Sequence, residues 1–181
     1  MRKSNQDCLT DRHLLLFGTI IHWFARYELL MQNMMAAVAR TDAASVMLLT
    51  RGLDFSGKLR ALLDLLRHKT IPLDQFDRIS ELLMIPHTLT LLRNDIAHSG
   101  WIPHKIGNWI QPDWILHFPP SVKPLRADLN VPTPTFTELD QDKVGYSVDE
   151  LSEVASRLAA TYAQLSDYVR EIHLIDPGND S

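Results

Sequence analysis

The chain has 181 residues, a length that suits one domain with a sizeable hydrophobic core and does not require two. Hydrophobic residues make up 45% and charged residues 22%, a balance that excludes an intrinsically disordered chain. The formal net charge of −4 argues against a protein that holds nucleic acid over a broad basic face, but not against a local cationic pocket.

Three features indicate the cellular compartment. The lone Cys8 cannot form a disulfide within the chain, which favours a reducing environment. The first residues are polar and no secretory apolar core follows them. The most apolar run, residues 14–25, is too short to span a bilayer and contains His22. We therefore expect a cytoplasmic protein without a membrane anchor.

The first predicted helix covers residues 11–39, with Thr10 as its N-cap. Apolar residues occupy nearly every side of it, so it should be buried by several neighbours, or by a neighbour and a second subunit. Within it, His22 is expected to be a hydrogen-bonded core histidine. Glu28 is expected to pair with Arg26 or to lie in solvent.

Two shorter helices should follow. Thr41 or Asp42 caps the first of them, which should stop near Gly52. Asp54 caps the second, whose leucines recur at helical spacing: Leu59, Leu62, Leu63 and Leu66.

Prolines mark the boundaries of the next helices. Pro72 opens a helix, and Pro86 should break or kink it because proline removes a hydrogen bond and clashes with the preceding turn. A further helix should run from about Pro86 through residues 93–98 and end at Gly100.

Residues 101–145 differ in kind from the rest, because seven of the ten prolines lie between Pro103 and Pro134. Residues 109–118 are β-type and residues 130–139 are a weaker candidate, so a small β-hairpin or an ordered flap is expected.

After this insertion, Ser147 and Glu150 form a capping box for a last helix to about residue 173. Its apolar stripe consists of Leu151, Val154, Leu158, Tyr162, Leu165 and Val169. The sequence thus predicts an all-α helical bundle in one domain, residues 1–181, with residues 101–145 as an irregular insertion.

The polar groups that suggest chemistry gather before Gly100. Asn94 and His98 are four residues apart and so share one helix face. Arg93 lies well round the helix, but its long side chain can return to that face. His has an unperturbed pKa of about 6.5 and suits proton transfer near neutral pH. Arg can stabilise negative charge on phosphate oxygens, and Asn can hold an imidazole or bind a phosphate.

This segment resembles the signature of the HEPN family, in which an arginine, a polar residue and a short spacer precede a histidine. The matching residues are Arg93-Asn94 and Ile96-Ala97-His98. Residues 48–60 (LLTRGLDFSGKLR) and 146–151 (YSVDEL) are also similar to bacterial members. Residues 101–145 fall outside the resemblance.

The resemblance implies a HEPN-like helical bundle and a homodimer, with the motifs of two subunits facing each other. It also implies a metal-independent endoribonuclease of a toxin–antitoxin or other defence system, with a cognate antitoxin as a further partner. Arg93 and His98 would be catalytic and Asn94 supporting. Trp101, Asp95 and Ser99 beside them are the candidates for RNA contact. No cofactor or metal is expected.

Other interpretations stay open. The three polar residues could simply satisfy the last carbonyls of a helix, since basic groups favour that position. Trp101 could stack on bases, although packing onto the bundle is the commoner use of such a residue. Relatives also include non-catalytic interaction modules, so a silent helical module that binds a partner protein or nucleotide is the alternative function.

Overall fold

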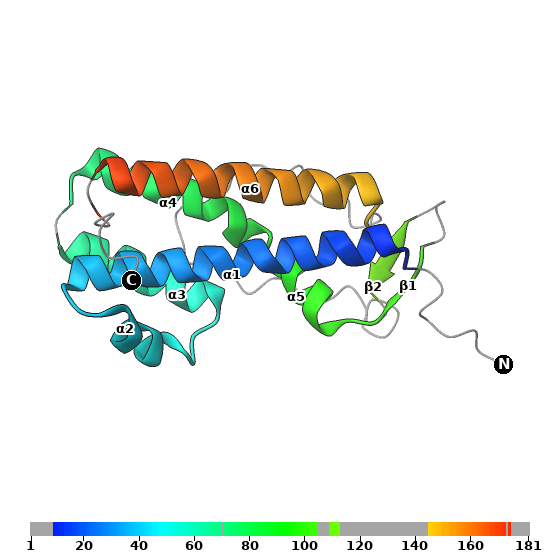
Figure 1. Cartoon of the computed structure of the whole chain (residues 1–181), viewed down its shortest axis with the longest axis horizontal. Helices are drawn as coiled ribbons and strands as arrows, with labels where there is room; N and C mark the ends of the chain where they lie inside the picture. Colours follow the sequence, from blue (N-terminus) through cyan, green and yellow to red (C-terminus); the bar gives the residue numbers. More distant parts are fainter. Residues whose placement is uncertain (1–8, 70, 105–108, 113–144, 173, 175–181) are drawn as a thin grey trace, which may run out of the picture.

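The computed structural model describes residues 9–69, 71–104, 109–112, 145–172 and 174. These residues form six α-helices and one two-stranded hairpin, which confirms the helical class (Figure 1). The expected strand at residues 130–139 lies outside the described residues.

The longest helix, α1 (Asp11–Ala39), begins and ends where local sequence dictates. The Thr10 hydroxyl accepts a hydrogen bond from the His13 backbone N–H, and His13 Nδ1 accepts one from the Thr10 N–H at 3.2 Å. Arg40 ends the helix in the left-handed conformation, with φ of 55°. His13 is buried, and that burial lowers its pKa.

Helix α6 (Val148–Glu171) lies alongside α1 and runs in the same direction (Figure 1). The predicted capping box is present, with the Ser147 hydroxyl accepting from the Glu150 N–H and the Glu150 carboxylate accepting from the Ser147 N–H. Between the helices, the buried Tyr27 hydroxyl donates to the Leu158 carbonyl at 3.0 Å. Burial raises the pKa of Tyr27. The contact joins the two longest helices.

Two further helices, α2 (Ala43–Thr50) and α3 (Phe55–His68), pack against α1. As predicted, Asp42 and Asp54 are their N-caps, and the Asp54 carboxylate accepts from the Gly57 N–H at 2.7 Å.

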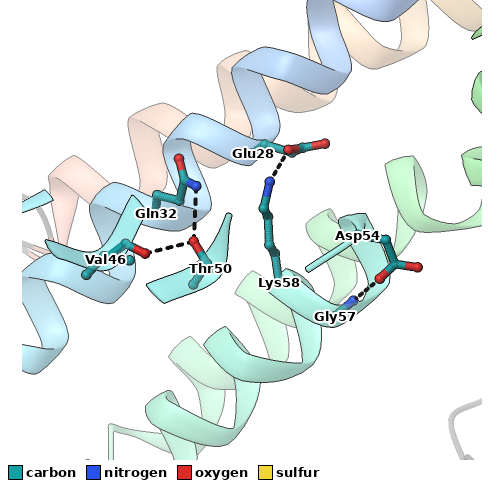
Figure 2. Close-up of polar contacts among 7 residues, drawn as sticks. All are labelled: Glu28, Gln32, Val46, Thr50, Asp54, Gly57 and Lys58. Atoms are coloured by element: carbon teal, nitrogen blue, oxygen red, sulfur yellow. Dashed lines mark hydrogen bonds and ion pairs between the residues drawn. The ribbon is translucent and has the colours of Figure 1, made fainter. Parts of the chain in front are cut away.

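Polar contacts tie these helices to α1 (Figure 2). Gln32 donates to the Thr50 hydroxyl at 3.1 Å, which in turn donates to the Val46 carbonyl at 2.8 Å. Lys58 pairs with Glu28. The expectation for Glu28 was therefore wrong. Residues two positions apart do not share a helix face, and Arg26 lies over the ring of Tyr162.

The break at Pro86 was placed slightly too early. Helix α4 (Leu73–Thr88) continues through Pro86, and Leu89 separates it from α5 (Thr90–His98). Pro86 lacks an N–H and so weakens the helix, but it does not end the helix at that residue. One more turn follows, closed by the Leu89 N–H, which donates to the Pro86 carbonyl at 3.1 Å.

A small antiparallel hairpin follows α5, formed by β1 (Trp101–Pro103) and β2 (Ile110–Pro112). A hairpin was expected here, but the first strand begins directly after Gly100 rather than within the β-type run. Tyr146 adds a bridge to β2, since its N–H donates to the Ile110 carbonyl at 2.7 Å and its carbonyl accepts from the Ile110 N–H at 3.1 Å. The bridge holds the start of α6 beside the hairpin.

The core follows α1 through the bundle. Its fully buried large side chains include Ile20, Phe24, Tyr27, Met31, Met34, Leu62, Leu83, Leu151 and Leu158. By length and composition alone, α1 could also cross a membrane. In the structure it packs against α2, α3, α5 and α6.

The buried pair between Glu28 and Lys58 gives a stability prediction. The Lys58 side chain is 10% exposed, so Glu28→Ala leaves a buried ammonium without its counter-charge. We expect a loss of about 2 kcal/mol in the free energy of unfolding, less than for a fully buried pair because Glu28 keeps some solvent contact.

Urea unfolding measures this loss, and Glu81→Ala is the matched control. Glu81 forms an exposed pair with Arg78, so its removal should cost about 0.5 kcal/mol or less. Similar losses from both substitutions would show that the buried pair contributes no more than a surface one.

Candidate functional site

Helix α5 presents the candidate residues on its solvent side. Leu92 is buried in the core and Ile96 is partly buried against it, which fixes the rotation of the helix. The opposite side carries Leu91, Asn94 and His98, all exposed and spaced three and four residues apart. The structure therefore places Asn94 and His98 on one open face, in agreement with their spacing.

The Arg93 side chain bends toward that face. Its Nη1 donates to Asn94 Oδ1 at 3.1 Å, although the two residues are neighbours in the chain. Its Nε is buried and has no hydrogen-bond partner among the described residues. Thus the guanidinium reaches from the half-buried flank of α5 toward the exposed amide, and one of its donors stays unused.

His98 lies at the end of α5, where it is exposed. The last turn is closed by the backbone, with the Ser99 N–H donating to the Asp95 carbonyl at 3.0 Å. Within the described residues, none of the side chains of Arg93, Asn94 and His98 bonds a helix carbonyl. The interpretation that they merely satisfy the end of the helix is therefore not what the structure shows.

The three residues do not form one contact within a single chain. Arg93 bonds Asn94, whereas His98 makes no hydrogen bond, ion pair or ring contact with another described residue. The arrangement offers an exposed imidazole and an amide-bound guanidinium on the same helix. For Arg93 to bind a phosphate while His98 exchanges a proton at the same substrate, the substrate or a further group must reach both side chains.

Of the three residues expected to contact RNA, Trp101 packs inside the fold, whereas Asp95 and Ser99 lie beside the candidate site. Trp101 is only 4% exposed, with its ring centroid 4.7 Å from that of Phe17 and 6.0 Å from that of Tyr146. Its ring therefore packs the hairpin onto the bundle, the commoner of the two uses considered. Asp95 and Ser99 are half-buried, on the flank and at the end of α5.

Tyr146 is the neighbour that the motif did not indicate. Burial raises its pKa to about 12, and the negative charges of Asp95 and Glu150 add to the effect. It lies next to Trp101 as well, so α5, the hairpin and the start of α6 meet at this residue. No spacing rule links residue 95 to residue 146, and only the fold brings them together.

His22, expected in the core, is exposed on α1, with its ring edge-on to Trp23 at 5.6 Å between centroids. The expectation failed because the apolar run around it overstates how much of the circumference of α1 is covered. In the part of the chain that is described, no three candidate metal-ligating side chains gather.

The charge of Asp95 gives a prediction for Tyr146. The pKa of Tyr146 lies above the ordinary value of about 10, so the folded state favours the protonated phenol. The resulting contribution to stability is present below pH 10 and is lost as the pH rises from about 10 through the raised pKa. Asp95→Asn removes one negative charge and should lower the pKa of Tyr146, as followed by phenolate absorbance in an alkaline titration.

Tyr146→Phe identifies which transition belongs to this residue, and Asp74→Asn on the exposed surface of α4 is the matched control. An unchanged Tyr146 transition in Asp95→Asn would contradict the electrostatic coupling.

Comparison with protein-family models, curated proteins and solved structures finds no match to this chain. The function must therefore be inferred from the residues of α5 and from their geometry. The likeness to HEPN proteins stays a likeness of motif.

Proposed function

We propose that this chain is a metal-independent endoribonuclease with a HEPN-like bundle. The observation that supports this most directly is the hydrogen bond from Arg93 to Asn94, which turns a guanidinium toward the exposed face that also carries His98. A permanent cation and an imidazole then border one open surface. That pairing suits phosphodiester chemistry without a metal.

In the proposed reaction, the ribose 2′-hydroxyl attacks the neighbouring phosphorus. Its proton passes to a base, the bond from phosphorus to the 5′-oxygen breaks, and that oxygen takes up a proton. The products are a 2′,3′-cyclic phosphate and a free 5′-hydroxyl. His98 is the proton-transfer group, and Arg93 stabilises the negative charge on the phosphoryl oxygens. Asn94 holds the guanidinium in place.

The chemistry favours a homodimer. One turnover needs a group that accepts a proton and another that donates one, and α5 supplies a single histidine. His98 of a second copy would fill the other role. This agrees with the dimeric arrangement implied by the motif, and a cytoplasmic toxin or defence protein with a cognate antitoxin is the corresponding context.

One observation favours the alternative, a catalytically silent interaction module. Leu91 is 74% exposed on the same face as Asn94 and His98. A large apolar side chain there suits contact with a protein better than contact with a phosphate backbone. Under this alternative, Arg93 and His98 would contact a partner rather than a substrate.

Cleavage of a total-RNA pool in EDTA separates the two functions. We expect metal-independent cleavage by the wild type, ending in cyclic phosphate. His98→Ala should lower the rate by roughly 10²–10⁴-fold, and Arg93→Ala by roughly 10²–10³-fold.

The matched controls are His68→Ala and Arg60→Ala, exposed residues of the same types on α3, which should cleave like the wild type. Circular dichroism checks that every variant folds. An inactive wild type would favour the interaction module, and equal cleavage by all variants would place the activity elsewhere.

The net charge of −4 gives a second prediction, for RNA affinity. RNA should be recognised locally, through few phosphate contacts. A plot of the logarithm of the binding constant against that of salt concentration should have a shallow slope, of about −2 or less in magnitude. Fluorescence anisotropy with His98→Ala, which binds without cutting, measures it. A steep slope would indicate a broad basic surface and contradict local recognition.

A further inference from the structure

One face of α1 is apolar where it meets solvent. Leu15 and Leu29 are 69% and 50% exposed, and Gly18, His22 and Ala25 lie exposed between them. Successive members of this set are three or four residues apart, so all five lie along one stripe of the helix. We call these five residues the α1 stripe.

Gly18 has no evident purpose within the single chain. A Cβ atom at this position would meet nothing within 4 Å, so no neighbouring element requires a glycine. Glycine in a helix interior is also less favourable than alanine. A glycine at such a place is explained if another backbone approaches it closely from outside, and the small Ala25, seven residues on, has the same effect.

The other long helix provides an internal comparison. The solvent face of α6 is polar or small, with Glu153, Ser156, Arg157, Ala160, Ala163, Gln164 and Asp167 exposed. Among the described residues, nine large hydrophobic side chains are exposed, and eight of them lie on α1, α2 or α5 or directly after α2. Figure 1 shows α2 and α5 on the same side of α1, and both pack against it. Most of the exposed apolar side chains therefore lie on α1 or near helices that pack against it.

The order of residues indicates what covers the stripe. From His22 toward the N-terminus the stripe presents Gly18 and then Leu15. Toward the C-terminus it presents Ala25 and then Leu29. A surface that is the same in both directions fits a copy of itself related by a two-fold axis. We infer that a second copy of this chain packs on the α1 stripe, antiparallel, with His22 near the axis, Leu15 facing the partner's Leu29, and Gly18 and Ala25 permitting close contact.

A lipid surface fits the same stripe less well. His22 lies at its centre and Arg26 at its edge, and a net charge of −4 does not favour anionic lipid. A stable dimer buries on the order of 800 Å² per copy. The stripe supplies part of such an area. The exposed Met47, Leu48 and Leu49 of α2 and Leu91 of α5 lie on helices that pack against α1.

This interface rests on the proposed function for its purpose, because the second histidine of the proposed reaction comes from a second copy, and α5 packs against α1. Its existence is tested without RNA. Light scattering coupled to gel filtration should show a wild-type dimer at micromolar concentration. Ala25→Arg places two unpaired charges in the interface and should raise the dissociation constant on the order of 100-fold.

Ala163→Arg on the exposed side of α6 is the matched control and should remain dimeric. Because Ala25 is exposed in the single chain, its substitution should leave the circular dichroism spectrum unchanged. A wild-type monomer, or an Ala25→Arg variant that dimerises like the wild type, would overturn the inference.

Cysteine cross-linking tests the position of the axis. In a Cys8→Ser background, His22→Cys should form a disulfide-linked dimer on mild oxidation, whereas Gln164→Cys on α6 should not. Cross-linking by Leu91→Cys with none by His22→Cys would assign the interface to α5 alone and overturn the α1 pairing. Flotation of a monomeric wild type with anionic vesicles would overturn it in favour of a membrane.

Failure of the interface and failure of the nuclease are distinguishable. A dimer that His22→Cys cross-links but that cuts no RNA contradicts only the enzymatic function. A wild-type monomer that cuts RNA in EDTA contradicts the interface and leaves the chemistry of Arg93 and His98 in place.

Discussion

A helix of 29 residues with apolar side chains on most of its circumference cannot stay in water, and the rest of the molecule is arranged around this constraint. Helix α6 covers one side of α1 along much of its length (Figure 1). Helices α2 and α3 cover another side toward the C-terminal half, and α5 packs against α1 as well. Helix α4 packs instead on α3, α5 and α6.

The polar contacts of α1 show how the bundle limits the cost of burying charge and hydrogen-bonding groups. Tyr27 donates a hydrogen bond to a carbonyl of α6, and Gln32 donates one to Thr50 of α2. Glu28 neutralises Lys58 of α3. A buried polar group with a defined partner permits few alternative packings, so these contacts determine which helix lies against which part of α1. The apolar contacts alone would be less selective.

The candidate site depends on α1 indirectly, through the packing of α5. Leu92 is held in the core next to α1, and this sets which side of α5 faces solvent. Because Leu89 separates α4 from α5, α5 is a separate short helix. Trp101 and Tyr146 then pack beyond its end. The exposed position of His98 thus follows from burial elsewhere.

The sequence by itself determined where α1, α2, α3 and α6 begin. Thr10, Asp42, Asp54 and the pair Ser147 and Glu150 act through hydrogen bonds within a single turn, and such local signals do not depend on the rest of the fold. The shared face of Asn94 and His98 follows from helical geometry in the same way.

Only the tertiary structure decided which faces are covered and which distant residues meet. His22 is exposed rather than buried, Glu28 binds Lys58 rather than Arg26, and β1 starts immediately after Gly100. Asp95 comes to lie near Tyr146 for the same reason. Periodicity gives the angle of a residue on its helix, whereas its burial and its partners depend on elements far away in the chain, which no local pattern specifies.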